Sequence, residues 1–269
     1  MGEVIVITSG KGGVGKTTAT ANIGTSLAIA GKKVVLIDAD IGLRNLDVVM
    51  GLENRIVYDL VDVIEGSCRL RQALVRDKRF EELYLLPAAQ TRDKNAIVPE
   101  QMKKLCDELK EEFDFVLVDS PAGIEHGFKN AVAGANKAII VTVPEVSAVR
   151  DADRIIGMLT AHDIINPQLI INRLRIDLVN RGDMMNIEDT IEILGIDLLG
   201  VVPDDEQIVV STNRGEPVAV DLDHMAGKAF RNIASRILGD DVPIMDLNED
   251  RSFLKRFKRI FGIEKNKSH

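Results

Sequence analysis

Residues 8–18 form a glycine-rich stretch whose residue types suit a chain of phosphates. Gly10, Gly15, Lys16 and Thr17 match the spacing G-x-x-x-x-G-K-[ST] of a phosphate-binding loop. The glycines let the backbone curl so that successive N–H groups point at a phosphate. We expect Lys16 to reach the β- and γ-phosphates of a nucleoside triphosphate and the Thr17 hydroxyl to ligate Mg²⁺. The residues of this stretch expected to line the phosphates are Gly12, Gly13, Val14, Gly15, Lys16, Thr17 and Thr18.

Acidic residues at the ends of apolar runs supply the rest of such a site. Residues 115–119 predict a buried strand that ends in Asp119, whose carboxylate fits an acid that holds Mg²⁺ through water. The Pro-Ala-Gly that follows predicts a switch loop in which the Gly123 N–H senses the γ-phosphate. Asp38 and Asp40 end another apolar run. A lone aspartate after a strand is commonly a turn former or a helix cap, but strand ends of a parallel sheet converge on the ligand crevice.

These residues can form one site only if a sheet brings the ends of several strands together, and the sequence pattern predicts such a sheet. Apolar runs alternate with helical patterns, which is typical of a mostly parallel sheet with helices on both faces. Strands are expected at 4–7, 33–38, 83–86, 115–119, 138–143, 169–171 and 198–202. Helices are expected at 19–30, 101–111, 126–133, 147–161, 187–194 and 225–238, and a polar loop at 39–55. The sequence therefore predicts a doubly wound α/β fold of the P-loop NTPase type with about seven to eight strands, in one domain over residues 1–238.

Charge is divided unevenly along the chain. The 269 residues carry a net charge of −8, yet the segment from Arg251 onward holds seven Lys/Arg and one acid. A basic tail on an acidic body directs the tail to an anionic partner and disfavours a DNA-binding body. Cys68 and Cys106 lack metal-ligand spacing and are expected to be free thiols. We expect no signal peptide and no transmembrane helix.

The basic tail also carries the pattern of an amphipathic helix at 251–263. Its apolar residues fall on one helical face: Phe253, Leu254, Phe257, Ile260 and Phe261. The basic residues between them include Lys255, Arg256, Lys258 and Arg259. This arrangement predicts a helix that lies in an anionic membrane surface, although a docked terminal helix or a basic protein-binding arm would show the same pattern. Residues 239–250 are expected to be a flexible tether and 264–269 a disordered terminus.

The phosphate loop has a second lysine, Lys11, ahead of its glycine cluster. The stretch Ser-Gly-Lys-Gly-Gly-Val-Gly-Lys-Thr-Thr at 9–18 resembles the deviant loop of the MinD/ParA family of ATPases. The resemblance implies that Lys11 crosses a homodimer interface and touches the partner's phosphates, where it would assist catalysis as an arginine finger does. It also implies that Asp38 belongs to the outer Mg²⁺ shell and that Asp40 positions the attacking water. We therefore expect ATP and Mg²⁺ as cofactors, with Lys11, Lys16 and Asp40 as catalytic residues.

The resemblance also implies where the base binds. Family members contact adenine at the ends of the strands at 169–171 and 198–202, which here carry Asn172, Arg173, Pro203 and Asp204. The Asn172 amide could read a purine edge, and a capping role after the strand is an equal alternative. No Gln or Arg stands out as a built-in water-positioning residue, which predicts slow ATP hydrolysis that a partner accelerates.

Longer stretches narrow the resemblance to the septum-site-determining (MinD) branch of the family. These are residues 40–59, 87–94 and 144–154. The resemblance implies a peripheral protein of the cytoplasm and the inner face of the cell membrane, which recruits a MinC-like division inhibitor and is regulated by a MinE-like or other topological regulator. It assigns the partner surface to Arg44, Ser147, Asp151 and Asp153. The acids at 151 and 153 also fit an ordinary helix start.

Two other classes within the family share the loop. A ParA-like partition ATPase would bind DNA, and the acidic body and apolar tail oppose that interpretation. A FlhG-like flagellar-number regulator shares the amphipathic tail but usually carries an extension before the first strand, which is expected here near residue 3. We therefore expect no specific nucleic-acid partner.

Overall fold

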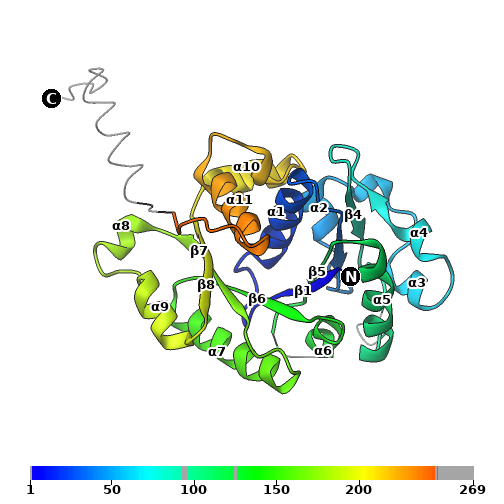
Figure 1. The fold of residues 1–269 in the computed structure, drawn as a ribbon, viewed down its shortest axis with the longest axis horizontal. Coiled ribbons are helices and arrows are strands. Elements are labelled where there is room, and N and C mark those ends of the chain that lie inside the picture. Colours follow the sequence, from blue (N-terminus) through cyan, green and yellow to red (C-terminus); the bar gives the residue numbers. More distant parts are fainter. Residues whose placement is uncertain (1, 93–95, 124–125, 246, 248–269) are drawn as a thin grey trace.

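The computed structural model describes residues 2–92, 96–123, 126–245 and 247. Its centre is an eight-stranded sheet in the order β3-β4-β2-β5-β1-β6-β7-β8 (Figure 1). All neighbouring strands pair in parallel except β3 and β4, which are antiparallel. The strands are β1 (Glu3–Thr8), β2 (Val34–Asp38), β3 (Val75–Arg76), β4 (Leu83–Leu86), β5 (Phe115–Asp119), β6 (Lys137–Thr142), β7 (Gln168–Leu174) and β8 (Asp197–Pro203). The predicted doubly wound parallel fold is confirmed.

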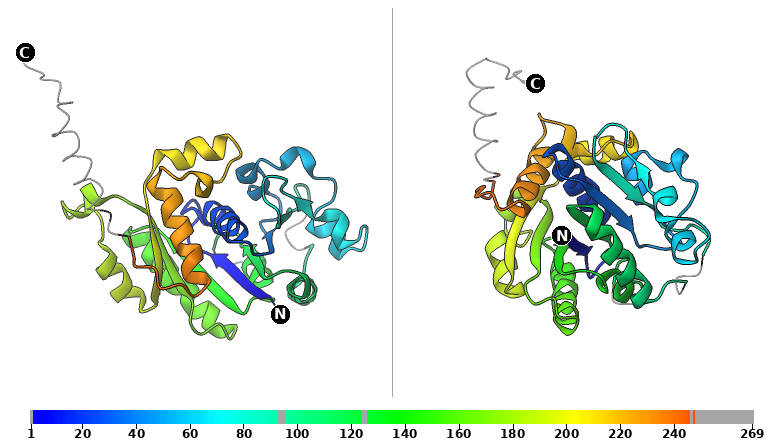
Figure 2. Two further views of the ribbon diagram at one scale, coloured as in Figure 1. Left: turned by 45° about the horizontal axis from the view of Figure 1, so that its top comes forward. Right: turned by 45° about the vertical axis from the view of Figure 1, so that its right-hand side comes forward.

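Helices connect these strands and cover the sheet. They are α1 (Lys16–Ile29), α2 (Leu46–Met50), α3 (Leu60–Ile64), α4 (Leu70–Ala73), α5 (Pro99–Glu112), α6 (His126–Val132), α7 (Val146–Ala161), α8 (Ile176–Val179), α9 (Ile187–Leu194), α10 (Glu206–Asn213) and α11 (Met225–Ile237), with short 3-10 turns η1 (Glu53–Arg55) and η2 (Val218–Val220). Figure 2 shows them in two layers, one on each side of the sheet.

The two helix layers explain why the sequence of the first strand is an unbroken apolar run. Val4 and Val6 of β1 pack in the cluster that includes α5, α6 and α7, while Ile5 and Ile7 pack in the opposite cluster with α1 and α11. Successive side chains of a strand point to opposite faces, so a strand covered on both faces must be apolar at every position.

The segment 39–55 is not only a loop, as the sequence analysis had it, because it contains α2 and η1. The Asp38 carboxylate accepts hydrogen bonds from the backbone N–H groups of Asn45 and Leu46, both at 3.1 Å, and so satisfies donors at the start of α2. Leu46 and Met50 are fully buried. A capped turn with two buried apolar side chains is stable here, although its polar composition predicted a loop.

The strand expected at 169–171 is also longer than predicted. β7 continues to Leu174, which pairs with Pro203 of β8, so that Asn172 and Arg173 lie within the strand instead of after it. Pairing with β8 keeps the backbone extended past the polar residues, and this long-range contact has no local sequence signal.

The described part of the expected tether, residues 239–245 and 247, lies against the body of the protein. The Arg236 guanidinium donates to the carbonyl oxygens of Val242 at 2.7 Å and Pro243 at 2.6 Å, and Leu247 is 6% exposed. These residues of the expected flexible tether therefore contact the body through Arg236 and the buried Leu247. The expected amphipathic helix at 251–263, with all of its apolar and basic residues, and the terminus at 264–269 lie outside the described residues.

Two further expectations can be compared with the described residues. No helix among them is both long and apolar enough to cross a membrane. Cys68 and Cys106 are free thiols, as predicted. Burial raises the pKa of the Cys106 thiol to about 12, which makes it an unreactive core residue.

Candidate nucleotide site

The predicted site residues from the first half of the chain meet at one edge of the sheet. β1, β2 and β5 are neighbours, and the carboxyl ends of these parallel strands lie together. The glycine-rich loop leaves β1 at this edge and enters α1 at Lys16. The register pairs Asp38 with Asp119. The arrangement is the ligand crevice that an open parallel sheet forms at the carboxyl ends of its strands.

The loop has the backbone of an anion cradle. Gly13 and Gly15 adopt φ angles of 78° and 99°, in the left-handed region that glycine tolerates. A Cβ atom on Gly15 would lie 2.2 Å from the Asn172 Nδ2 atom, so no larger residue fits there. The first turn of α1 leaves its N–H groups and positive dipole end at the loop. These features fit the phosphates of a nucleotide.

Asn172 supports this loop from β7. Its Nδ2 donates to the Val14 carbonyl oxygen at 2.7 Å, and the side chain is 3% exposed. Among the described residues its Oδ1 atom has no hydrogen-bond partner. Sequence analysis placed Asn172 at the base. In the structure its amide nitrogen holds the phosphate loop, and its Oδ1 atom is buried without a partner among the described residues. The loop contact spans 158 residues of sequence, so no local pattern could have indicated it.

Two carboxylates lie buried below the loop. Asp38 and Asp119 are each 1% exposed. Asp119 Oδ1 accepts a hydrogen bond from Thr20 Oγ1 at 3.3 Å, and that hydroxyl also contacts the Lys16 carbonyl oxygen at 3.0 Å. Burial raises the pKa of both carboxyls above the ordinary value, while the positive charge of Lys16 lowers that of Asp119. Sequence analysis missed Thr20, although it lies one helical turn after Lys16.

Buried carboxylates of this kind are stabilised by a cation. The described part of the chain has no group of three or more His, Cys, Asp or Glu side chains placed to hold a metal by itself. A hard cation here would therefore need oxygens from a hydroxyl, a phosphate and water besides the carboxylates, as Mg²⁺ bound to a nucleotide has. Lys16, Thr17, Asp38 and Asp119 fit Mg²⁺-nucleotide better than a metal bound by protein alone.

The residues of the predicted switch loop lie near these acids. The Asp40 N–H donates to Asp38 Oδ1 at 3.0 Å, so the two aspartates form one short turn after β2. Asp40 lines a cavity of about 50 Å³ together with Pro121 and Ala122 of the loop after β5. Gly123 has φ 86°, and its N–H donates to the Ser9 carbonyl oxygen at 3.2 Å. The N–H expected to sense a phosphate is thus engaged with the phosphate loop.

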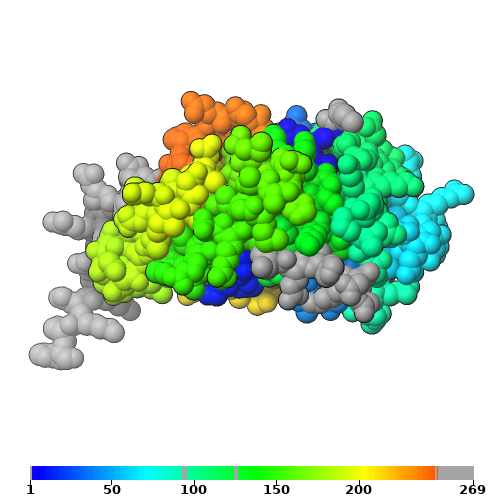
Figure 3. All heavy atoms as spheres, turned by 90° about the horizontal axis from the view of Figure 1, so that it is seen from below, coloured from blue at the N-terminus to red at the C-terminus, as the bar shows by residue number. Residues whose placement is uncertain are grey.

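Lys11 extends toward its own α7. Its Nζ lies 3.2 Å from Glu145 Oε2 and 3.4 Å from Ser147 Oγ. Next to it, a Cβ atom on Gly10 would lie 2.3 Å from the Asp151 carbonyl oxygen, so the loop and α7 are in direct contact. The structure therefore joins Ser147 and Asp151 of the expected partner surface to the phosphate loop. Figure 3 shows α7 in green at the centre of one face of the molecule.

The remaining residues of the expected partner surface are Asp153 and Arg44. Asp153 is exposed on α7. Arg44, with φ 33°, pairs through Nε with Asp47 Oδ2 at 2.8 Å in the segment that leads into α2. Sequence analysis did not single out Glu145, which precedes α7 and pairs with Lys11.

The expected base residues lie at the ends of β7 and β8. Arg173 is exposed with φ 56°, and the Asp204 N–H donates to the Leu174 carbonyl oxygen at 3.0 Å. A hollow of about 350 Å³ opens at this end of the two strands. It is lined by Leu174, Ile176, Pro203, Asp204, Asp205, Glu206, Met225 and Leu247.

Comparison with known proteins agrees with a nucleotide site in this fold. Residues 5–218 match the family described as the CobQ/CobB/MinD/ParA nucleotide binding domain. The chain is 60% identical over 266 residues to the septum site-determining protein MinD of Bacillus subtilis, covering 98% of this chain and 99% of that protein.

Solved structures agree. A chain in the MinC:MinD cell division protein complex of Aquifex aeolicus is 52% identical, with a TM-score of 0.85 and coverage of 91% of this chain and 98% of that one. The septum site-determining protein MinD of Pyrococcus horikoshii, complexed with Mg-ADP, is 29% identical with a TM-score of 0.78, covering 90% of this chain and 100% of that one.

Proposed function

Because this chain belongs to the septum site-determining MinD group of the CobQ/CobB/MinD/ParA nucleotide-binding ATPases, we propose that it is a membrane-recruited switch controlled by ATP. In this proposal ATP joins two copies, the dimer resides on an anionic membrane and presents α7 to a MinC-like division inhibitor, and hydrolysis releases it. The observation that carries the proposal is the contact of Lys11 with Glu145 and Ser147, which connects the phosphate loop to the proposed partner surface.

Binding of Mg²⁺-ATP would use the loop and the two buried acids. The backbone of residues 11–18 and the Lys16 ammonium would hold the phosphates. Thr17, Asp38 and Asp119 would hold Mg²⁺, directly or through water, and Mg²⁺ would supply charge stabilisation to the transferring phosphoryl group. The buried positions of Asp38 and Asp119 beside the start of α1 support these roles. The structure of the P. horikoshii relative with Mg-ADP supports the choice of ligand.

Asp40 is our candidate for orienting the attacking water. Its backbone is fixed by Asp38, and it lies beside Pro121 and Ala122 of the proposed switch loop. Gly123 would give up its hydrogen bond to Ser9 in order to contact a phosphate. That exchange makes the switch loop sensitive to what the phosphate loop holds.

Lys11 would couple dimer formation to the partner surface. A lysine side chain that contacts Glu145 and Ser147 of its own chain cannot at the same time reach the phosphates of a second copy. We propose that dimerisation removes Lys11 from this contact and exposes the polar groups at the start of α7, where Ser147, Asp151 and Asp153 lie. The complex of a relative with MinC supports a MinC-like protein as the partner. We assign its docking to this surface and to Arg44.

Membrane residence is assigned to the segment 251–263, which lies outside the described residues. Its five apolar side chains under a basic face are the sequence support. One such short helix binds weakly, whereas two on a dimer gain avidity of about 10²–10⁴-fold without new contacts. The protein would therefore be peripheral on the inner face of the membrane, with residence set by the nucleotide and by a topological regulator.

Analytical ultracentrifugation of Lys11→Ala tests the dimer step. We expect the unmodified chain to dimerise with Mg²⁺-ATP and not with Mg²⁺-ADP, and the variant to stay monomeric with both. Lys78→Ala, an exposed lysine outside the site, is the matched control and should dimerise normally. An ATP-dependent dimer of Lys11→Ala as tight as that of the unmodified chain would contradict the assigned role.

A further inference from the structure

The chain after α11 turns back and runs beside β8 toward the carboxyl ends of the strands, where the nucleotide is proposed to bind. We call the described residues 239–245 and 247 the strap. Figure 1 shows it as an orange segment that leaves α11 and passes β8 in the direction of α8. The strap thus connects the end of the body to the neighbourhood of β7 and β8.

Arg236 clamps the strap to the last strand of the sheet. Its Nη1 donates to the Leu199 carbonyl oxygen of β8 at 2.8 Å, while Nε and Nη2 donate to the carbonyl oxygens of Val242 and Pro243. Gly200 of β8 allows α11, which carries Arg236, to lie close to the strand, because a Cβ atom at Gly200 would lie 2.4 Å from Ile233 Cγ1 of α11. β8 is an edge strand, so the clamp also satisfies a carbonyl group at the open edge.

Leu247 ends the strap inside the hollow at the strand ends. Its side chain is 6% exposed and lines that hollow with Leu174, Pro203 and Met225. By contrast, Ile244 earlier in the strap is 39% exposed. The buried leucine thus anchors the strap at the proposed base edge.

The hollow is placed and built to receive a purine. Leu174 and Asn172 both belong to β7, and Asn172 contacts the phosphate loop. A volume of about 350 Å³ falls within the range of small-molecule sites, about 300–1,000 Å³. Its walls combine apolar side chains for a ring face with Asp204 for a ring edge, while the Asp205 carboxylate accepts from the backbone N–H groups of Gln207 and Ala226.

We propose that Leu247 is a base-contacting residue of the nucleotide site, held in place by the Arg236 clamp; this rests on the proposed nucleotide function. Base binding and strap docking then favour each other, because each completes the pocket that the other needs. The consequence is that a bound nucleotide fixes the strap, and with it the point from which the segment at 251–263 leaves the body.

Nucleotide affinity of full-length variants tests this inference. We expect Leu247→Ala to weaken ADP binding about three- to tenfold, because an apolar contact with the base is lost, and to leave the affinity for inorganic pyrophosphate unchanged. Ile244→Ala is the matched control in the same strap and should bind both ligands as the unmodified chain does. Hydrogen exchange supplies a second measurement: ADP should slow exchange of residues 239–247 in the unmodified chain, and pyrophosphate should not.

The outcomes distinguish a failure of the inference about Leu247 from a failure of the proposed nucleotide function. ADP affinity of Leu247→Ala within twofold of the unmodified chain overturns the inference and leaves the proposed function intact. An equal loss for ADP and pyrophosphate also overturns it, because the effect would then not concern the base. Failure of the unmodified chain to bind ADP at all would instead refute the proposed function.

Discussion

Asp38 and Asp119 occupy paired positions at the ends of the neighbouring parallel strands β2 and β5, each with 1% of its surface exposed. Two like charges at this depth oppose each other unless a cation or proton is present. Burial is the larger cause of the raised pKa of both, and for Asp38 the charge of Asp119 adds to it. The pair therefore lowers the stability of the protein without ligand and raises the stability that the protein gains when a cation binds.

Asp119→Asn should separate these two effects. Without ligand we expect the free energy of unfolding at pH 7 to rise by about 1–3 kcal/mol, because a buried charge is removed while the amide oxygen can still accept from Thr20. With Mg²⁺-ADP at 100 times its Kd the unmodified chain should gain about 2.7 kcal/mol, and the variant much less. Urea unfolding with and without ligand measures both.

The control for that experiment is Asp183→Asn, an exposed carboxylate that pairs with Arg181. It should change neither quantity by more than about 0.5 kcal/mol. A ligand-free Asp119→Asn protein less stable than the unmodified chain would contradict the assignment of a strained acidic pair.

Asn172→Ala should loosen the phosphate loop. The variant leaves the Val14 carbonyl oxygen without its side-chain donor, which we expect to cost about 1–3 kcal/mol of stability. Because the loop binds phosphates, affinity for pyrophosphate should fall together with affinity for ADP, measured by titration calorimetry. Asn180→Ala, an exposed asparagine after α8, is the control. Unchanged pyrophosphate affinity in Asn172→Ala would show that Asn172 acts on the base alone.

Glu145→Gln should favour the dimer. The Lys11–Glu145 pair is about half exposed on both sides, and such pairs contribute about 0.2–1 kcal/mol. Since this contact must break for Lys11 to cross to a second copy, its loss should tighten the ATP-dependent dimer by up to about fivefold. Sedimentation equilibrium measures the change, with the exposed Glu188→Gln as control. A weaker dimer in Glu145→Gln would argue that Glu145 serves the dimer and does not restrain Lys11.

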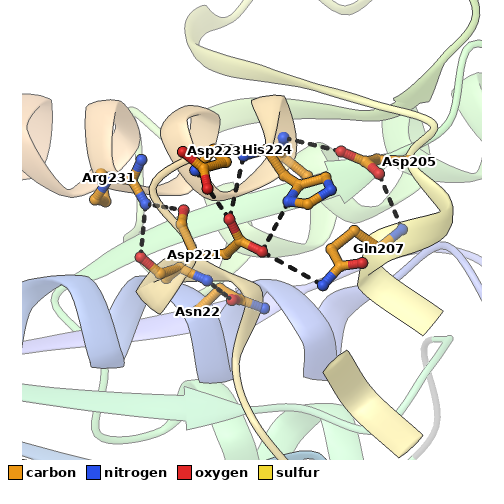
Figure 4. A network of polar contacts seen from close by, with 9 residues as sticks. Asn22, Asp205, Gln207, Asp221, Asp223, His224 and Arg231 are labelled. Atoms are coloured by element: carbon orange, nitrogen blue, oxygen red, sulfur yellow. Dashed lines mark hydrogen bonds and ion pairs between the residues drawn. The ribbon is translucent and has the colours of Figure 1, made fainter. Parts of the chain in front are cut away.

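A hydrogen-bonded histidine next to α11 predicts a pH-dependent contribution to stability. His224 Nδ1 lies 2.7 Å from Asp221 Oδ2, in a network that includes Asp205 and Gln207 (Figure 4). The Asp221 hydrogen bond raises the pKa of His224, and the His224 hydrogen bond lowers the pKa of Asp221. The stabilisation is therefore complete below the ordinary histidine pKa of about 6.5 and above the ordinary aspartate pKa of about 3.9.

The Tm difference between the unmodified chain and His224→Gln reports this contribution. It should be largest near pH 5.5–6 (roughly, from those ordinary values) and should shrink as pH rises through the raised pKa of His224. Salt at about 0.5 M should reduce the difference, because the pair is exposed and screened. A Tm difference that grows between pH 6 and pH 8 would have the wrong sign for this pair.

The sequence predicted the parts of the site that local pattern determines. β1, the loop and α1 are contiguous, so the spacing of the loop predicted the roles of Lys16 and Thr17. The alternation of apolar runs and helical patterns along the chain predicted the fold. Asp119 could be placed because it ends an apolar run.

The contacts made across the sheet could not be predicted in this way. Asn172 reaches the loop because β7 extends past its apolar core, and Glu145 meets Lys11 because α7 starts beside the loop. The strap has the composition of a linker, with Gly239, Pro243 and two aspartates, yet it contacts the body through Arg236 and the buried Leu247. These outcomes depend on which strands are neighbours, and that information is distributed over the whole chain.

Sedimentation with vesicles of anionic phospholipid tests the central claim most directly. The full chain and a chain truncated after Asp250 would each be mixed with vesicles in Mg²⁺-ATP and in Mg²⁺-ADP. We predict that only the full chain with ATP sediments with the vesicles, because in our proposal membrane binding needs two C-terminal segments on one ATP-bound dimer. Equal sedimentation of the full chain in ATP and ADP, or its absence in both, would contradict the account, and binding to duplex DNA in ATP would then favour a partition ATPase.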